Sequence, residues 1–333
     1  MHETMILSKY VSELSYDALP ADVIIAAKNC ILDYMGCALF ATQTDMGKII
    51  ADFCRQGNTG RCTILPDFHG KYDATFAGLA NGTFAHGFEL DDIDLPSISH
   101  PGAAVIPAAL ALAEERGVSG KRFLEAIVVG YEIMSRVGRP IAAPHLERGH
   151  HPTGTFGTYG ATAACCKILG LDAERTAWAF GIAGSLASGL AQFSISGSMV
   201  KRIHAGKSAQ QGVMSAKLAE KGYTGPIDIL EGKLGFCRTF RGDTETVNLK
   251  ALTDDLGKTY AITDTTVKPS AACGVLHAPI ECIQKIRAAN SFEPDDIEKI
   301  VVRGHHNLVH AHNVYEPTSI LSAQYSLPFN VGM

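Results

Sequence analysis

The sequence predicts a mainly α-helical protein with a small α+β domain that begins near residue 260. Apolar residues recur at helical spacing through most of the chain. The first 250 residues show no alternation of strand and helix patterns, which argues against a parallel-sheet domain. Near residue 245 the composition changes to runs of threonine, valine and isoleucine, which favour strands.

Six segments carry the helical pattern. Ile24, Tyr34 and Ala38 fall on one stripe of the first segment. Ser119 and Asp172 are expected N-caps. Gly222 is an expected helix stop. The predicted helices span residues 21–40, 73–88, 101–116, 120–137, 173–190 and 208–221.

Residues 176–200 contain no charged side chain and are long enough to cross a bilayer. Many of them are small or polar, so a membrane span is a poor interpretation. Gly181, Ser185 and Gly189 stand four residues apart, a spacing that lets a second helix approach closely. We therefore expect a tightly packed core or dimer helix here.

The last part of the chain has a different character. Ile300, Val301 and Val302 form a β-branched run after the turn-like residues 293–295. Residues 322–333 resemble the start of a further helix, whose apolar face needs a packing partner. We therefore expect a truncated chain.

Composition sets the class of protein. The chain has 333 residues, 29 basic and 34 acidic, and a net charge of −5. Bulk charge therefore gives no reason to expect nucleic acid as a partner. The N-terminus lacks a secretory signal pattern, so we expect a cytoplasmic protein. The nine cysteines are an odd number without a CxxC pair, which indicates reduced and mostly buried thiols.

A first polar cluster lies in residues 81–101. If this segment is helical, His86, Glu89 and either Asp92 or Ile93 share a face, and His100 follows them. Buried acids are costly unless they are paired or used. The alternative is an acidic cap and loop that precede the helix after Pro101.

Three further clusters follow along the chain. Glycines and Pro152 bracket His151, an arrangement that presents a side chain to a cavity or merely to solvent. The second of these clusters comes directly after the charge-free segment. Its cations could simply be stabilised by the negative, C-terminal end of a helix dipole. In the last cluster, Lys268 fits an anion-binding lysine and His277 fits a tunable imidazole, with structural packing as the competing interpretation. The second cluster contains Lys201, Arg202, His204 and Lys207.

Metal, nucleotide and nucleophile chemistry have weaker signals. Four histidines crowd one short stretch, but no HExxH pattern is present and the context favours strand or loop. The sequence has no GxGxxG after a strand, no P-loop and no GxSxG elbow. We expect no metal and no cofactor. The crowded histidines are His305, His306, His310 and His312.

Seven motifs, in this order, resemble the MmgE/PrpD family, which includes 2-methylcitrate dehydratase, cis-aconitate decarboxylase and iminodisuccinate epimerase. Together they run essentially from end to end of the chain. The motifs are AHGFELDD (85–92), SHPGAAVIPAALALAE (99–114), HPTGTFG (151–157), CKILGLD (166–172), MVKRIHAG (199–206), VKPSAACGVLH (267–277) and SAQYSLPFNVG (322–332).

The resemblance implies an all-helical main domain over residues 1–260 and an α+β lid domain, incomplete here, over residues 261–333. It also implies a cofactor-free active site between the two domains and a homodimer. Glu89 and Ile93 stand where the decarboxylase branch usually has Asp and Thr, and Phe329 stands where it has Tyr. The implied active-site residues are Glu89, Asp92, His100, His151, Lys201 and His277, with Lys268, His204 and Lys207 as substrate contacts.

These residue types suit proton abstraction next to a carboxylate. Such a carbon acid is weak, so it needs a base near neutrality and fixed positive charge. We expect His100 or His151 as the base, and His277 or Lys201 as acid and charge stabiliser, while Glu89 or Asp92 orients an imidazole. The sequence thus predicts a cofactor-free lyase that removes water or CO2 from a small di- or tricarboxylate. The alternatives are an epimerase or isomerase of a dicarboxylate and a catalytically silent, dimeric scaffold.

Overall fold

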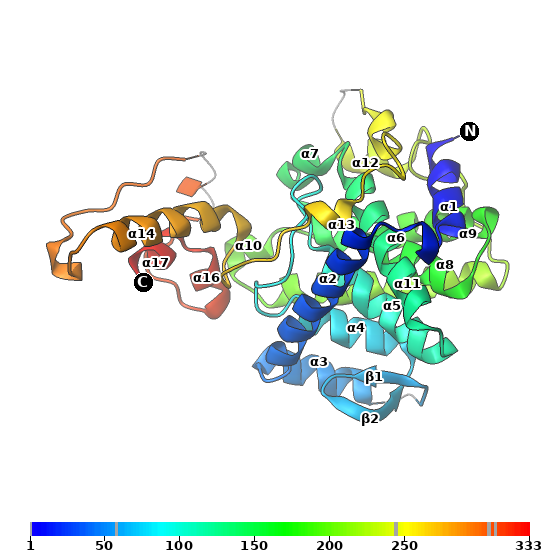
Figure 1. Ribbon diagram of the computed structural model, residues 1–333, viewed down its shortest axis with the longest axis horizontal. Coiled ribbons are helices and arrows are strands. Elements are labelled where there is room, and N and C mark those ends of the chain that lie inside the picture. Colours follow the sequence, from blue (N-terminus) through cyan, green and yellow to red (C-terminus); the bar gives the residue numbers. More distant parts are fainter. Residues whose placement is uncertain (1, 57–58, 243–245, 305–307, 310–311) are drawn as a thin grey trace. The chain divides into compact units, whose positions relative to one another are not determined.

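The computed structural model describes residues 2–56, 59–242, 246–304, 308–309 and 312–333, and confirms a mainly α-helical fold (Figure 1). The chain divides into two compact units. Unit 1 comprises Met1–Ala191 and Val200–Val267, and unit 2 comprises Gln192–Met199 and Lys268–Met333. The domain boundary after residue 260 stays a prediction.

Unit 1 is a bundle of helices with one small hairpin. Its long helices supply most of the core residues, and its short helices lie in the connections between them. The helices are α1 (Glu3–Glu13), α2 (Ala21–Ala41), α3 (Asp45–Arg55), α4 (Ala74–Ala85), α5 (Pro101–Arg116), α6 (Gly120–Gly138), α7 (Ala142–Glu147), α8 (Pro152–Leu169), α9 (Ala173–Leu186), α11 (Val200–Glu220), α12 (Phe236–Arg241) and α13 (Ala261–Asp264).

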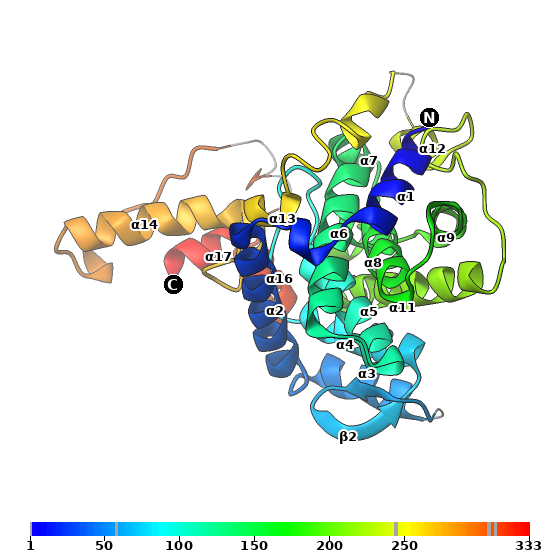
Figure 2. The ribbon, with the colours of Figure 1, turned by 45° about the vertical axis from the view of Figure 1, so that its right-hand side comes forward.

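Helices α4, α5, α6, α8 and α11 pack against one another in the centre of unit 1 (Figures 1 and 2). Small residues allow this close packing. A Cβ atom on Gly206 of α11 would lie 2.1 Å from the Leu79 carbonyl oxygen of α4. Ser119 and Asp172 accept bonds from the Arg122 and Arg175 amides, which confirms both predicted N-caps.

We had expected a helix in the charge-free segment 176–200, but the segment does not form one continuous helix. Helix α9 ends at Leu186, and Gly189 lies outside it with a φ of +144°. Gly181 does permit a close approach, but its neighbour is the loop at Gly225 and Pro226 rather than a second helix. The helix predicted from Ser208 begins earlier, at Val200.

Helix α2 is long and apolar enough to cross a membrane by length and composition alone, and a third of its most apolar window is buried. Core helices of soluble proteins pass the same test. Ala27, Tyr34 and Ala38 of α2 are buried in the core of unit 1. The predicted stripe of this helix is therefore its inner face.

Several elements of unit 1 lie outside the predicted helices, among them α1, α3 and an antiparallel hairpin of β1 (Cys62–Ile64) and β2 (Asp67–Tyr72). The hairpin is held to the helices by side-chain bonds. The Thr63 amide donates to Glu114 Oε2 at 2.7 Å, and the Leu65 amide donates to Asn81 Oδ1 at 3.0 Å.

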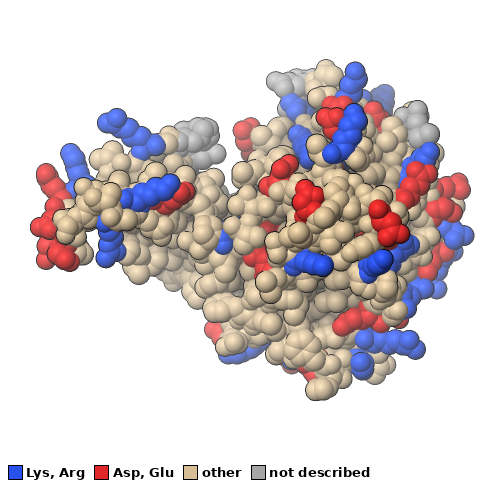
Figure 3. Space-filling view, viewed as in Figure 1, with Lys and Arg blue, Asp and Glu red and all other residues tan. Residues whose placement is uncertain are grey.

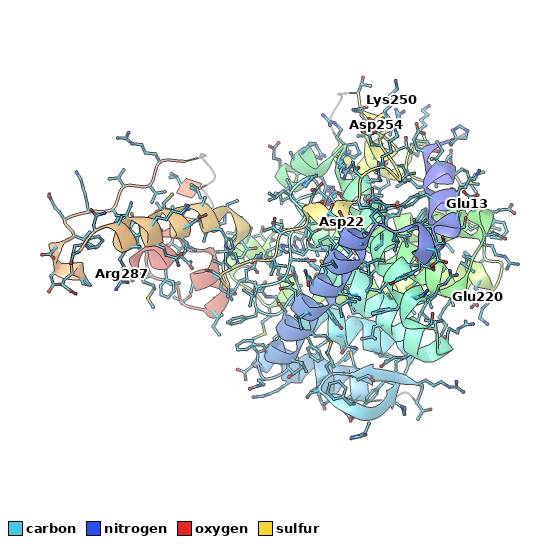
Figure 4. The ribbon with its side chains drawn as sticks, viewed as in Figure 1. Glu13, Asp22, Glu220, Lys250, Asp254 and Arg287 are labelled. Atoms are coloured by element: carbon cyan, nitrogen blue, oxygen red, sulfur yellow. The ribbon has the colours of Figure 1, made fainter. Side chains whose placement is uncertain are left out.

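The segment after α12 is fixed to α6 by a buried ion pair. Arg136 Nε lies 2.5 Å from Glu132 Oε1, and the guanidinium also donates to the carbonyl of Asp254, which Figure 4 labels. The second Glu132 oxygen accepts the Ala261 amide at 2.7 Å. The pair thus holds the backbone at Asp254 and at the first residue of α13.

The α-helices whose bounds are described in unit 2 are α10 (Phe193–Ser196), α14 (His277–Ala289), α16 (Ile320–Tyr325) and α17 (Leu327–Gly332). The predicted turn at residues 293–295 is a 3₁₀ turn, Pro294–Asp296, closed by a capping box. The Ile300–Val302 run forms no strand, contrary to our expectation. The expected last helix is divided in two where Pro328 starts the second piece.

All nine cysteines are free thiols and seven of them are buried, as predicted. Burial raises the pKa of Cys54 and Cys62 to about 12, so neither is an activated nucleophile. Acidic and basic side chains are interspersed on the face of unit 1 that Figure 3 draws.

Candidate functional site

The first polar cluster lies in a turn rather than on a helix. Helix α4 ends at Ala85. The prediction that His86, Glu89 and Asp92 share a helical face is therefore wrong. Glu89 has a φ of +61°, a left-handed conformation that costs energy for a residue with a side chain. The tight turn nevertheless brings all three side chains into the interior of unit 1.

Glu89 is the anion of a buried charge cluster. Lys201 Nζ lies 2.5 Å from both of its carboxylate oxygens, and an Arg202 nitrogen lies 2.5 Å from Oε2. Arg202 also donates to the His86 carbonyl at 2.9 Å. Two basic side chains thus share one buried carboxylate.

The helix-dipole alternative for these cations is wrong. Lys201 and Arg202 lie in the first turn of α11, which begins at Val200. A helix N-terminus is the positive end of the dipole and disfavours cations. The pairing with Glu89 is therefore what offsets their burial.

Asp92 connects the turn to two helices. Its Oδ1 accepts the Gly102 amide at 3.0 Å, which satisfies one free N–H in the first turn of α5, and its Oδ2 accepts the Tyr131 hydroxyl at 2.6 Å. Asp92 thus satisfies part of the first turn of α5, although the N-cap residue itself is His100, whose side chain makes no capping bond. Burial, together with the nearby carboxyl of Asp33, raises the pKa of Asp92 to about 7.

His100 has a tautomer that its neighbours fix. Its Nδ1 lies 2.6 Å from the carbonyl oxygen of Asp92, which can only accept a hydrogen bond. Nδ1 therefore carries the proton, and Nε2 keeps a basic lone pair. The His100 amide donates to Thr153 Oγ1 at 3.2 Å, which ties the start of α5 to the start of α8.

Four imidazoles form one group in unit 1. The rings of His86 and His100 are 5.0 Å apart, those of His86 and His151 are 5.7 Å apart, and those of His151 and His204 are 5.1 Å apart. His151 is the N-cap residue of α8, so it is presented from the end of a helix. His204 comes from α11.

Burial favours the neutral forms of His151 and His204. Burial and the charges of neighbouring His86 and Lys201 hold the pKa of His151 well below its usual range. Burial, with Lys207 nearby, lowers the pKa of His204 to about 4. His151 Nδ1 and His204 Nδ1 are 3.0 Å apart, so one of them carries a proton and the other accepts it.

Lys207 lies on α11, and its ammonium binds backbone. Nζ donates to the Ser188 carbonyl at 2.7 Å and the Gly154 carbonyl at 3.2 Å. Burial lowers its pKa to about 8. It therefore fixes the loop after α9 beside the start of α8, while its predicted substrate contact stays a prediction.

Lys268 and His277 belong to unit 2, and their part in the site stays a prediction. His277 is the first residue of α14, and its Nε2 lies 3.1 Å from the Ala272 carbonyl. His305, His306 and His310 lie outside the described residues. His312 Nδ1 binds the Tyr325 carbonyl at 2.9 Å.

One group within the described ranges could hold a metal ion. His86, Asp91 and His100 each offer a ligand atom within 4.8 Å of the others. Hydrogen bonding also accounts for this geometry, because Asp91 Oδ2 lies 2.6 Å from His86 Nδ1 and 3.5 Å from His100 Nδ1. The donor set alone therefore does not call for a metal.

The structure adds site residues that the sequence did not assign. His86, Asp91 and Arg202 stand within the clusters already noted, so their neighbours gave a signal. Tyr131 on α6 and Asp33 on α2 reach Asp92 from other helices, and the Asp92 amide donates to Asp33 Oδ2 at 3.1 Å. No local pattern marks these two, because only the tertiary fold brings them to Asp92.

Known proteins are similar to this sequence over much of its length. The MmgE/PrpD N-terminal domain matches residues 5–247, and the MmgE/PrpD C-terminal domain matches residues 270–333. The cis-aconitate decarboxylase-like protein oryM of Aspergillus oryzae is 34% identical over 84% of this chain. The cis-aconitate decarboxylase of Aspergillus terreus is 30% identical over 84% of it, and that of Homo sapiens is 31% identical over 64% of it.

The chain spans 61%, 59% and 45% of the lengths of these three relatives, respectively. Both domains of one family are matched in order, and together they cover nearly the whole chain. The chain therefore belongs to the MmgE/PrpD family.

Proposed function

We propose that the protein is a cofactor-free lyase that removes CO2 or water from a small di- or tricarboxylate. The observation that carries this proposal is the group of His86, His100, His151 and His204 beside the Glu89–Lys201–Arg202 trio. The relatives named above, which bear the names of cis-aconitate decarboxylases, support the reaction class.

Proton transfer next to a carboxylate needs a base that is unprotonated at neutral pH. His100 is the first candidate, because the Asp92 carbonyl holds its Nδ1–H and leaves Nε2 as the basic nitrogen of the neutral ring. His151 is the second candidate, since its surroundings keep it neutral. We assign the proton transfer to this pair of imidazoles.

Negative charge develops on the substrate carboxylate in such a reaction, and fixed positive charge stabilises it. Lys201 and Arg202 supply this positive charge. It is preorganised, because Glu89 holds both side chains before any substrate arrives. Asp92 positions His100 through its backbone carbonyl and, through its carboxyl, holds the first turn of α5.

The test is turnover of cis-aconitate, citrate and 2-methylcitrate, followed by proton NMR in D2O with EDTA present. Loss of CO2 identifies a decarboxylase, loss of water a dehydratase, and deuterium exchange without net conversion an epimerase. We expect His100→Gln to lower kcat/KM by about 10²-fold or more. His69→Gln, an exposed change on the hairpin, is the control.

Turnover that EDTA abolishes, or that His100→Gln leaves intact, would overturn the proposal. No turnover of the whole panel would favour the silent scaffold. The homodimer and the cytoplasmic location remain predictions, and sedimentation velocity tests the first of them.

A further inference from the structure

His86 and Asp91 lie deeper than the imidazoles assigned to proton transfer. The exposed fractions are 0% for His86 and 2% for Asp91, against 8% for His100 and 6% for His151. The His86 ring stacks on the His151 ring at an interplanar angle of 29°. His86 and Asp91 thus form an inner layer behind the imidazoles that reach the surface of unit 1.

Asp91 fixes the tautomer of His86. Its carboxylate Oδ2 lies 2.6 Å from His86 Nδ1, and an ionised carboxylate only accepts hydrogen bonds. The proton of the neutral ring therefore stays on Nδ1. His86 Nε2 is buried and has no hydrogen-bond partner among the described residues, so an unprotonated nitrogen is kept inside the cluster.

We infer that His86 is a positioning residue of the site: Asp91 locks its ring, which supports His151 from behind and presents no N–H from Nε2 to the other imidazoles. The inference rests on the proposed function for its link to catalysis. The groups that face His86 are Asp91 and Glu89 from its own turn, Lys201 from α11, and the rings of His100 and His151.

The consequence concerns the proton inventory of the site. A carboxylate behind a histidine holds the ring in one orientation and one tautomer, and its amide replacement allows the wrong tautomer. If Asp91 became Asn, its NH2 group could face Nδ1 and drive the His86 proton to Nε2. That proton would then lie inside the cluster, beside the imidazoles that act as bases.

The first test needs no substrate. In ¹⁵N-histidine NMR of the wild-type protein at pH 7, we expect His86 to show a protonated, pyrrole-like Nδ1 and an unprotonated, pyridine-like Nε2. In Asp91→Asn we expect the Nε2–H form to appear, and the titration midpoint of His151 to shift by about half a unit or more. A wild-type His86 with Nε2–H, or an unchanged His151 in the variant, would overturn the inference.

The second test measures activity with the substrate that the panel identifies. His86→Asn keeps a donor near the position of Nδ1 but removes Nε2 and the ring face. We expect kcat to fall by about tenfold or more, with little change in KM and a shifted pH profile. Glu132→Gln is the matched control, a buried carboxylate outside the cluster, which should lose stability but keep the pH profile.

The outcomes separate the two proposals. The predicted His86 tautomer together with no turnover of the panel contradicts the proposed function alone. Turnover with the wild-type pH profile in both His86→Asn and Asp91→Asn contradicts the positioning role alone.

Discussion

At the scale of single residues, Glu89 is the carboxylate that holds two buried cations in the site. A buried ion pair gains little net stability, yet removing one partner is costly because the other charge is left unpaired. Glu89 is shared by Lys201 and Arg202, so its loss removes a carboxylate partner from two buried cations, whereas the loss of Lys201 leaves Glu89 still paired with Arg202. The carboxylate is therefore the most sensitive member of the trio.

We expect Glu89→Gln to destabilise the protein by about 3–5 kcal/mol, and Lys201→Met to destabilise it by less. Urea unfolding of both variants and of the double variant measures this. The double variant should be more stable than Glu89→Gln, because the buried ammonium of Lys201 is no longer present. Equal losses in the two single variants would show that Glu89 is not the shared partner.

Asp92 gives a pH dependence with a defined sign. Its folded pKa of about 7 lies above the unfolded value of about 3.9. Its stabilising contribution is therefore present below the unfolded pKa and is lost as the pH rises through about 7.

Asp92→Asn cannot ionise and should escape this loss. We expect its free energy of unfolding, relative to wild type, to improve between pH 4 and pH 8, by an amount on the order of a few kcal/mol. Denaturant titrations at several pH values measure the difference. A difference that stays flat with pH would show that Asp92 is ionised throughout.

The predictability of the site follows from how each residue reaches it. Glu89, Asp92, His100, His151, Lys201 and His204 stand in short polar clusters that interrupt apolar helices, so the sequence reveals them. Tyr131 looks like an ordinary core residue of α6, because only the fold places its hydroxyl 2.6 Å from Asp92. Likewise, the sequence alone could not show that Lys201 begins a helix rather than follows one.

At the scale of elements, glycine decides how closely the central helices pack. Gly206 of α11 faces α4, where a Cβ atom would lie 2.1 Å from the Leu79 carbonyl oxygen and 2.2 Å from Thr83 Oγ1. Gly36 on α2 offers a contrast, because a Cβ atom there meets nothing within 4 Å. Both glycines lie inside helices, so propensity alone favours alanine at each.

We expect Gly206→Ala to destabilise the protein by about 1–3 kcal/mol through overpacking. Gly36→Ala, its matched control, should stabilise it by up to about 1 kcal/mol. Thermal unfolding of the two variants compares them. Stabilisation by Gly206→Ala would mean that α4 and α11 are further apart than described here.

The helices were predicted best where apolar periodicity and a cap coincide, as in α6 after Ser119 and α9 after Asp172. The predicted end of α9 was wrong, because residues 187–199 have no charged side chain that marks a helix boundary. The β1–β2 hairpin was missed because its strands are short and β2 is mostly polar. The local sequence therefore marks neither the end of α9 nor the two strands of the hairpin.

At the scale of the whole molecule, several buried histidines are kept neutral by the fold. Burial lowers the pKa of His145 to about 3 and that of His204 to about 4, and it holds that of His151 well below its usual range. The unfolded value is about 6.5. Each depressed pKa therefore contributes stability above pH 6.5 that is lost as the pH falls toward the folded pKa.

We expect the free energy of unfolding to fall steeply as the pH is lowered from about 6.5 to about 4. Asp92 acts in the opposite direction, but three histidines outweigh one carboxyl. His145→Gln should make the fall shallower, because one of these titrating groups is removed. A stability that is constant over this range would contradict the neutral state of the buried imidazoles.

The central claim is that imidazoles from distant parts of the chain form one site for a small carboxylate. Histidine-ring ¹⁵N NMR during titration with propane-1,2,3-tricarboxylate, an unreactive tricarboxylate, tests it most directly. We expect the resonances of His100, His151 and His204 to shift together with one dissociation constant, while those of His69 and His145 stay in place. Shifts confined to His69 or His145, or separate dissociation constants for the three site histidines, would contradict it.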